Sequence, residues 1–305
     1  MNKEFLDLAE QLKSSVSCTV RLNELMSGHT SFKIGGPADI LVLPESIEQL
    51  REVLKVVKET VVPLTLLGNG SNVLVRDKGI RGIVIKLGNM LRHFYEAEDL
   101  LVFGSGYSLA LASYKAMECG RTGMEFAVGI PGSIGGAVYM NAGAYDGEMQ
   151  NIVNCVKVMD LQGNERVLTA EELNFGYRKT SLQNSGLIVT EVTLKMPSGN
   201  KDEIKSKMDD FSHRRISKQP LEMPSAGSMF KRPSGYFAGT LIDQAGLKGY
   251  TVGGAQISTK HAGFVVNVGG ATAADVLQLI KDVQTKIKAG VGVELQPEVL
   301  VIGEE

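Results

Sequence analysis

The segment GIPGSIGGAVYMNAGAYDGE, residues 129–148, holds six glycines among its 20 residues. A glycine inside a regular helix or strand costs roughly 0.5–1 kcal/mol relative to alanine, so a core element gains nothing from this density. The pattern predicts a tight turn that leads into a short helix, with Ser133 as its N-cap residue. Bare backbone next to a helix N-terminus suits an anion such as a pyrophosphate. Close packing of strands and turns would also concentrate glycine here.

A second glycine loop, GNGSN at residues 68–72, follows the apolar run 63–68. Its backbone N–H groups suit an anion nest, to which Ser71 and Asn72 would add side-chain hydrogen bonds. The chain has no Walker loop, and GNGSNV (68–73) and GSGYSL (104–109) lack the third glycine of the Rossmann fingerprint. Two such loops favour a bound dinucleotide outside a Rossmann domain.

Length and composition limit the classes of protein. A chain of 305 residues with 43% hydrophobic and 22% charged residues predicts an ordinary globular protein of two or three domains. A formal net charge of −2 gives no global basic field to recruit nucleic acid. The sequence shows neither the apolar run of a signal peptide nor that of a membrane span.

Cysteine and histidine spacing indicates no bound metal and no disulfide framework. Cys18, Cys119 and Cys155 are far apart, which favours a reducing, cytoplasmic compartment. The four histidines show no ligand spacing, so we expect no structural or catalytic metal; they are His29, His93, His213 and His261.

The apolar periodicity predicts helices and strands that do not alternate strictly, which indicates the α+β class. Expected helices cover residues 1–15, 46–60, 108–119, 204–218 and a C-terminal stretch that begins at Thr272. Expected strands cover residues 39–44, 63–68, 82–87, 100–106, 151–160, 187–196 and 291–303. Ser46 and Gln49 form a predicted capping box.

Residues 29–39 (HTSFKIGGPAD), 66–75 (LLGNGSNVLV) and 129–145 resemble the FAD-binding segments of UDP-N-acetylenolpyruvoylglucosamine reductases. That family has the flavin fold of p-cresol methylhydroxylase and vanillyl-alcohol oxidase. The resemblance continues, in order, through segments 174–182, 225–233, 253–267 and 295–303, and so covers nearly the whole chain. The short run between residues 178 and 228 leaves no room for the extra substrate-capping loop of one subclass, so the chain resembles the compact type II subclass.

The resemblance implies an FAD-dependent enzyme that uses NADPH to reduce the enolpyruvyl ether of UDP-N-acetylglucosamine enolpyruvate to UDP-N-acetylmuramate, a peptidoglycan precursor. It implies two FAD-binding subdomains, residues 1–85 and 86–200, and a smaller α+β substrate-binding domain, residues 201–305. FAD would be bound non-covalently, and the glycines would let the backbone approach its pyrophosphate. The implied FAD-binding residues are Gly68, Asn69, Gly70, Ser71, Asn72, Gly129, Ile130, Pro131, Gly132, Ser133, Gly135, Gly136, Asn141 and Gly143.

Three residues match the catalytic positions of the family. Hydride addition to the enolpyruvyl double bond develops charge on the substrate carboxylate and requires a proton at the adjacent carbon. Arg178 in GYRKTS would bind that carboxylate, Ser228 in SAGSMF would donate the proton, and Glu298 in LQPEVLVIG would act as a further donor. Without the resemblance, a surface arginine, a turn serine and a strand-end carboxylate would be the simpler interpretations.

A further set of residues would bind the substrate. Arg214, Arg215 and Lys218 in HRRISKQP suit a diphosphate, although cations at a solvated helix C-terminus need no ligand. Arg232 stands where many relatives have asparagine, which adds a cation and leaves the substrate geometry there open. The implied substrate-binding residues are Tyr177, Arg214, Lys218, Lys231, Arg232, Tyr236, Gln256 and His261.

Two other functions remain open at this stage. An alcohol or sugar oxidase of the same flavin fold would keep the glycine loops without the series Arg178, Ser228 and Glu298. A nucleotide-binding module without turnover would be colourless when purified, whereas either flavoenzyme would be yellow. For the reductase we expect a cytoplasmic monomer with small-molecule partners, neither bound to nucleic acid nor inserted in a membrane.

Overall fold

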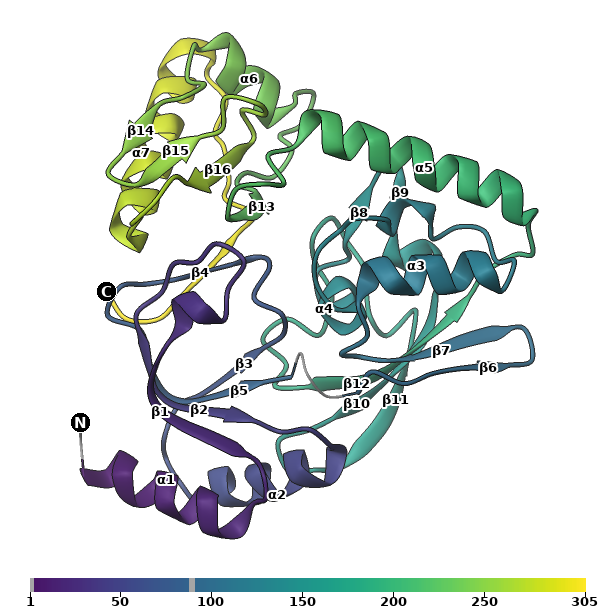
Figure 1. The fold of residues 1–305 in the computed structure, drawn as a ribbon, viewed down its shortest axis with the longest axis vertical. Helices are drawn as coiled ribbons and strands as arrows, with labels where there is room; N and C mark the ends of the chain where they lie inside the picture. The colour runs from purple at the N-terminus through teal and green to yellow at the C-terminus, as the bar shows by residue number, and fades with distance from the viewer. Residues whose placement is uncertain (1–2, 88–90) are drawn as a thin grey trace. The chain divides into compact units, whose positions relative to one another are not determined.

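The computed structural model describes residues 3–87 and 91–305, and its mixture of helices and strands confirms the α+β class (Figure 1). Contacts divide the chain into two compact units. The first comprises Met1–Arg21, Ile40–Asn69 and Ile83–Arg215, and the second comprises Leu22–Asp39, Gly70–Gly82 and Ile216–Glu305. The three-part division expected from the sequence stays a prediction. Among the described residues, no helix combines the length and apolar character needed to cross a bilayer.

A four-stranded sheet has the order β1 (Thr19–Leu25), β2 (Pro37–Leu43), β5 (Ile80–Lys86) and β3 (Leu64–Leu67). Its expected strands at 39–44, 63–68 and 82–87 are confirmed. Helices α1 (Lys3–Ser15) and α2 (Ile47–Lys58) lie side by side (Figure 1). The hydroxyl of Ser46 accepts the N–H of Gln49, as the predicted capping box requires, whereas the Gln49 side chain accepts the N–H of Glu45.

The first unit also contains an antiparallel sheet in the order β11 (Glu165–Thr169), β10 (Val153–Met159), β12 (Ile188–Lys195), β7 (Leu100–Gly104) and β6 (Phe94–Ala97). Helices α3 (Leu109–Glu118) and α4 (Ile134–Tyr139) pack on it. Their shared core includes Phe103, Leu109, Ile134 and Val192, none more than 1% exposed. The alternating apolar residues of the strands thus bury one face of the sheet against the two helices.

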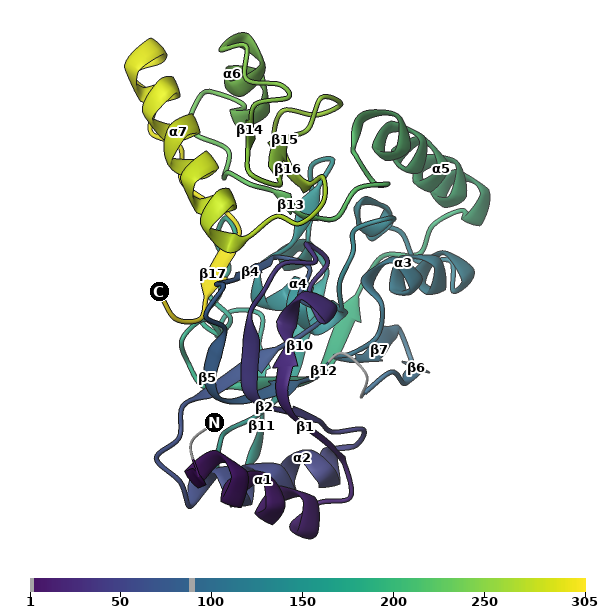
Figure 2. The same cartoon turned by 60° about the vertical axis from the view of Figure 1, so that its left-hand side comes forward.

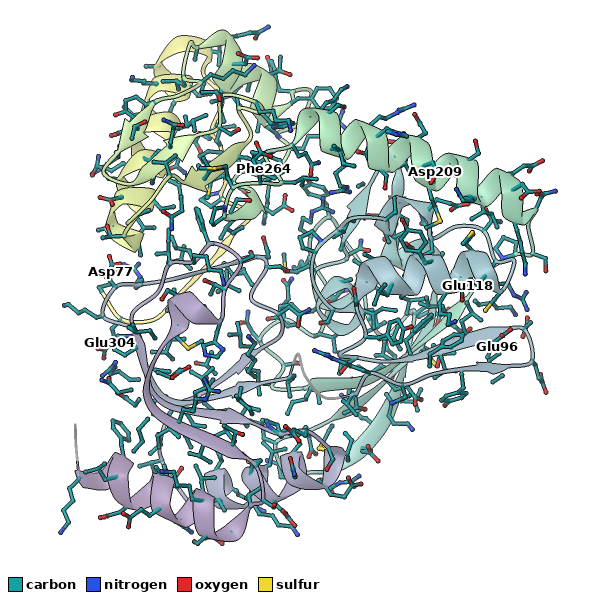
Figure 3. All side chains as sticks on the ribbon, viewed as in Figure 1. Asp77, Glu96, Glu118, Asp209, Phe264 and Glu304 are labelled. Carbon is teal, nitrogen blue, oxygen red and sulfur yellow. The ribbon has the colours of Figure 1, made fainter. Side chains whose placement is uncertain are left out.

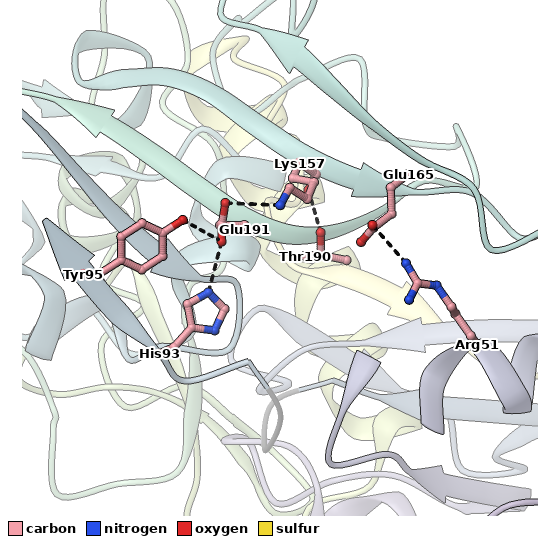
Figure 4. Close-up of polar contacts among 7 residues, drawn as sticks. All are labelled: Arg51, His93, Tyr95, Lys157, Glu165, Thr190 and Glu191. Atoms are coloured by element: carbon pink, nitrogen blue, oxygen red, sulfur yellow. Dashed lines mark hydrogen bonds and ion pairs between the residues drawn. The ribbon is translucent and has the colours of Figure 1, made fainter. Parts of the chain in front are cut away.

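A polar cluster lies on β6, β12 and β10 of this sheet (Figure 4). The carboxylate of Glu191 accepts a hydrogen bond from the Tyr95 hydroxyl at 3.3 Å and contacts the His93 ring nitrogen Nε2 at 3.2 Å. Lys157 lies 3.7 Å from its other oxygen. Burial raises the pKa of Tyr95, and the charge of Glu191 and the hydrogen bond to it raise that pKa further. The cluster therefore ties neighbouring strands together through one carboxylate.

Helix α5 (Lys201–Lys218) belongs to the first unit as far as Arg215. This part of the helix packs on the glycine-rich region. Its buried residues Met208 and Phe211 share a cluster with Val128, and the ring of Phe211 stacks on Tyr145 with centroids 4.3 Å apart. Tyr145 and Asp146 have φ values of +49° and +63°, between the short strands β8 (Gly143–Ala144) and β9 (Gly147–Glu148). The stack therefore supports a two-residue hairpin turn that is intrinsically strained for side-chain-bearing residues.

The second unit is built on a sheet in the order β13 (Ser225–Ser228), β16 (Phe264–Asn267), β15 (Ala255–Ile257) and β14 (Thr251–Val252), with α6 (Ala238–Gln244). Helix α7 (Ala273–Val291) packs against β14 and β15 (Figures 1 and 2). Thr272 and Asp275 form a capping box at its start, which confirms the predicted beginning of the helix. Asp77, labelled in Figure 3, accepts the N–H groups of Ala273 and Ala274 as well.

The strand expected over residues 291–303 is mostly irregular. Only β17 (Leu300–Ile302) forms, in parallel with β4 (Val73–Val75), and Pro297 makes an isolated bridge to Phe230. Pro297 has no N–H to donate to a ladder, and α7 extends to Val291 before Gly292 ends it with a φ of +72°. Leu295 and Val299 of this run are therefore buried without a continuous strand, whereas Val291 and Leu300 are exposed.

Candidate active site

The loop that precedes α4 has the geometry predicted from its glycines. Gly129 and Gly132 have φ values of +72° and +125°, which disfavour any residue with a Cβ atom. The hydroxyl of Ser133 accepts the N–H of Gly136 at 3.3 Å and so caps α4, as predicted. At Gly135, a Cβ atom would lie 2.7 Å from the Cβ of Ser105, so this glycine is required by packing inside the protein.

The structure brings Gly68 next to Ser133, within the first unit. A Cβ atom on Gly68 would meet only the Ser133 hydroxyl oxygen, at 3.7 Å, and one on Gly136 would meet the same oxygen at 3.4 Å. These two glycines therefore leave space that side chains would fill, around a serine hydroxyl and exposed backbone. That combination of donors and open backbone fits the pyrophosphate of FAD.

Gly70 and Asn72 have a different environment, in the second unit. Gly70 has a φ of +66°, and a Cβ atom there would lie 2.4 Å from the carbonyl oxygen of His29. Asn72 donates from its side-chain amide to the carbonyl of Glu298 at 3.3 Å. Gly70 is thus glycine because of packing inside the protein, and Asn72 connects its loop to the segment that carries a predicted catalytic residue.

Arg178 occupies a strained turn. Gly176 and Lys179 exchange both backbone hydrogen bonds, at 2.9 and 3.1 Å, around the two residues Tyr177 and Arg178. Arg178 has a φ of +55°, a conformation that costs a non-glycine residue roughly 1–2 kcal/mol. Its guanidinium lies 5.0 Å from the centroid of the exposed Tyr177 ring. This strained turn fixes where the Arg178 side chain begins, and its catalytic role stays a prediction.

Two backbone carbonyls hold the guanidinium of Arg178. Its Nη1 donates to the carbonyl of Asn141 at 3.3 Å, and its Nη2 donates to the carbonyl of Gly143 at 3.0 Å. The side chain of Asn141, a predicted FAD contact, is fully buried. Sequence reasoning therefore missed that the glycine-rich segment also orients the arginine, because the two are far apart along the chain.

Ser228 and Glu298 come from neighbouring backbone segments of the second unit. The N–H of Glu298 donates to the carbonyl of Met229 at 2.8 Å, directly after Ser228. Ser228 is exposed and pairs with Phe264, labelled in Figure 3, across an irregularity in β13 where Gly227 has a φ of +81°. Glu298 is half-buried. The structure thus brings two of the three predicted catalytic residues together, while Arg178 belongs to the first unit.

A serine that the sequence reasoning did not single out supports this region. Ser31 donates from its hydroxyl to the carbonyl of Ser225 at 2.7 Å, and its N–H donates to the carbonyl of Gly70. It lies in the segment 29–39, which the family resemblance had marked. Ser31 therefore links the Gly70 loop to the strand that ends at Ser228.

The basic residues of α5 have three different environments. Arg214 is exposed and bonded to Asp210, with Nη2 to Oδ2 at 2.7 Å and Nε to Oδ1 at 3.0 Å. Arg215 is 7% exposed, and its side chain lies against Gly129 and over the Tyr145 ring, 5.6 Å from the centroid. Burial lowers the pKa of Arg215. Lys218 is exposed at the end of the helix.

The other predicted substrate-binding residues lie in the second unit. Lys231 donates its N–H to the carbonyl of Gln296, next to Glu298 in the chain. The guanidinium of Arg232 lies 4.0 Å from the centroid of the exposed Phe237 ring, and Tyr236 is exposed. Gln256 is half-buried on β15 and donates to the hydroxyl of Thr251 at 2.9 Å.

His261 is half-buried next to Phe264, the residue that pairs with Ser228 between strands β16 and β13. Its Nδ1 accepts the N–H of Gly263 at 3.1 Å, and its ring meets the Phe264 ring edge-on with centroids 5.1 Å apart. Because Nδ1 is an acceptor, the proton of the neutral ring is on Nε2. Burial lowers the pKa of His261, and the charges of Lys248 and Lys218 lower it further. His261 is therefore a neutral donor at physiological pH.

Comparison with known proteins identifies the two parts of the chain. Residues 219–302 match the family described as UDP-N-acetylenolpyruvoylglucosamine reductase, C-terminal domain, and residues 38–169 match an FAD binding domain. The UDP-N-acetylenolpyruvoylglucosamine reductase of Clostridium perfringens is 50% identical over 302 residues, covering 99% of this chain and 98% of the relative. That of Clostridioides difficile is 49% identical over 286 residues, 94% of each chain. The crystal structure of the Thermus caldophilus reductase superposes with a TM-score of 0.79 at 38% identity, covering 94% of this chain and 99% of that one.

Proposed function

Because the chain belongs to the UDP-N-acetylenolpyruvoylglucosamine reductase family, we propose that it reduces UDP-N-acetylglucosamine enolpyruvate to UDP-N-acetylmuramate with its own Arg178, Ser228 and Glu298. It is an FAD-dependent oxidoreductase with NADPH as reductant. The chemistry that FAD supplies when bound is hydride transfer from NADPH to the terminal carbon of the enolpyruvyl group. The remaining demands of the reaction fall on protein side chains.

Arg178 is the residue that neutralises the charge developing on the substrate carboxylate. A guanidinium stays protonated at working pH and can donate two parallel hydrogen bonds to a carboxylate. The carbonyls of Asn141 and Gly143 fix the orientation of this guanidinium, so little reorganisation is needed when charge develops.

Ser228 donates the proton that the carbon next to the carboxylate requires, and Glu298 acts as a second donor to the developing charge. The observation that carries this assignment is the hydrogen bond from the N–H of Glu298 to the carbonyl of Met229, because it holds the two segments in register. A serine hydroxyl is a weak acid by itself. Its segment lies next to that of the half-buried Glu298, and its strand partner Phe264 contacts the His261 ring, which supports resupply of the proton by neighbours or water.

The residues around Gly68, Gly129, Gly132, Ser133 and Gly136 would hold the FAD pyrophosphate through backbone N–H groups and the serine hydroxyl. Lys218 would bind the diphosphate of the UDP-sugar, with Arg214 as a weaker contributor since Asp210 already neutralises it. We further propose that the enzyme acts as a monomer in the cytoplasm. The three free cysteines and the nucleotide-activated substrate support that compartment.

The two half-reactions separate these roles experimentally. None of the three catalytic residues is needed to reduce the flavin with NADPH. In stopped-flow absorbance measurements, Ser228→Ala should therefore bleach the flavin at nearly the parent rate. Its reoxidation by the UDP-sugar should slow by about 10²–10⁴-fold, the contribution of a positioned general acid.

Arg178→Ala and Glu298→Ala should show the same asymmetry. A Ser228→Ala enzyme that reoxidises at the parent rate, or that loses both half-reactions equally, would disprove the proton-donor role. A purified protein without flavin that leaves NADPH unoxidised would disprove the function as a whole.

A further inference from the structure

Besides the backbone hydrogen bonds between Gly176 and Lys179, side-chain contacts hold the Arg178 turn in place. On one side, Thr180 donates from its hydroxyl to the carbonyl of Tyr139 at 2.8 Å. Gln183 donates to the carbonyls of Tyr139 and Arg178, at 3.2 and 3.1 Å. Both contacts tie the turn to the last residue of α4, the helix that begins at the predicted pyrophosphate loop.

Asn141 makes the central contact of this arrangement. Its amide nitrogen donates to the carbonyl of Gly176 at 3.0 Å and to the carboxylate of Glu148 at 3.1 Å. Its amide oxygen accepts the N–H of Gln150 at 3.0 Å. Asn141 is 0% exposed, and its backbone has a φ of +42°. A buried polar residue is therefore kept in an unfavourable backbone conformation.

The same residue also touches Arg178 through its backbone. The carbonyl of Asn141 accepts from Arg178 Nη1, while its side chain holds the turn at Gly176, two residues before the arginine. Asn141 therefore fixes both the backbone that carries Arg178 and one of the carbonyls that orient the guanidinium.

We propose that Asn141 is the positioning residue that sets the guanidinium of Arg178 for the substrate carboxylate. It acts through Arg178, because its buried side chain is bonded within the protein to Gly176, Glu148 and Gln150. The FAD contact that the family resemblance implies for Asn141 stays a prediction. The inference rests on the proposed role of Arg178 and adds the residue that makes that role possible.

The donor and acceptor pattern explains why this position requires asparagine. An aspartate would keep the shape and accept from Gln150, but it would have no donor for Gly176 and would put two carboxylates side by side at Glu148. A serine would be too short to span the three partners. Both changes should let the turn move while the hydrophobic core around it stays intact.

The test compares Asn141→Asp and Asn141→Ser with Thr190→Val in the flavin-containing enzyme. Thr190 is 2% exposed in the same unit and donates its hydroxyl to the carbonyl of Lys157, so the control also removes a buried hydrogen bond. For each enzyme, flavin content, both half-reactions and the affinities for two ligands are measured. UDP-N-acetylmuramate has the carboxylate that Arg178 would bind, and UDP-N-acetylglucosamine does not.

Both Asn141 variants should reduce flavin with NADPH at the parent rate and should reoxidise about 10²-fold more slowly, the effect of misplacing a group by about 1 Å. They should also lose the preference for the carboxylate-bearing ligand, whereas Thr190→Val should keep it. Adding Glu148→Gln to Asn141→Asp should restore part of the rate, because glutamine gives the new carboxylate a donor. If Asn141→Asp does not fold, Asn141→Ser and this double variant carry the test.

Reoxidation at the parent rate, or an unchanged preference for the carboxylate, would overturn the inference. Equal loss of both half-reactions would overturn it too, since that is the result of a general structural defect. Arg178→Ala distinguishes a failure of the proposed role of Arg178 from a failure of the inference about Asn141. If that variant keeps the carboxylate preference, the proposed role of Arg178 fails; if it loses the preference and the Asn141 variants keep it, only the inference about Asn141 fails.

Discussion

Replacing Gly68 or Gly70 by valine should have opposite consequences, although the two glycines are separated by one residue. Gly68 has an ordinary φ, and its Cβ would meet only the Ser133 hydroxyl at 3.7 Å. Gly70 has a φ of +66°, and its Cβ would lie 2.4 Å from the carbonyl oxygen of His29. The first position has room that a ligand could use, and the second does not.

The magnitudes follow from these surroundings. At Gly70 the left-handed conformation alone costs roughly 1–2 kcal/mol, before the contact with His29 is counted. For a domain of this size that lowers the Tm of the flavin-free protein by at least about 2–8 °C. Gly68→Val should change the Tm of the flavin-free protein little. If it displaces one charge-assisted hydrogen bond to the pyrophosphate, about 1.5–3 kcal/mol, FAD should bind about 10- to 150-fold more weakly.

The assay is thermal unfolding of the flavin-free proteins together with calorimetric titration of FAD. Gly290→Val provides a control, because a Cβ at that position on α7 meets nothing within 4 Å and no predicted flavin contact is near it in sequence. Unchanged FAD affinity in Gly68→Val would refute the placement of the pyrophosphate at this loop. An unchanged Tm in Gly70→Val would refute the packing argument for the second glycine.

Two further predictions concern the second unit and the end of α5. Burial lowers the pKa of His261 in the folded state, and the charges of Lys248 and Lys218 lower it further. The neutral ring therefore contributes fully to the free energy of unfolding above the ordinary pKa of 6.5, and this contribution is lost as the pH falls through the lower pKa of the folded state. His261→Gln should therefore flatten the decrease of unfolding free energy below about pH 6.5, and an unchanged pH profile in urea titrations would contradict this. Lys218→Ala should raise KM for the UDP-sugar more than it lowers kcat, with a smaller effect for Arg214→Ala because Asp210 pairs with that arginine; equal KM values in parent and Lys218→Ala enzymes would show that this lysine does not bind the diphosphate.

Local sequence patterns were sufficient for most of the regular elements. Ser46, Ser133 and Thr272 cap the helices that they were predicted to begin, because a cap depends on residues within one turn of the chain. The strand prediction over residues 291–303 was wrong for most of its length. Leu295 and Val299 are buried there by irregular backbone, and only pairing with β4 decides which three residues form a strand.

The family, its cofactor and its reaction could be inferred because ordered motifs along nearly the whole chain resemble those of one family. Whether each glycine is required by packing or leaves space for a ligand could not be inferred in this way. Gly70 and Gly135 are required by backbone and side-chain atoms of distant residues, while Gly68 leaves open space beside Ser133. Such distances between segments far apart in sequence exist only after the chain has folded. The same reason explains Asn141, whose partners at Glu148, Gln150 and Gly176 come from a hairpin and from a turn that no local pattern connects.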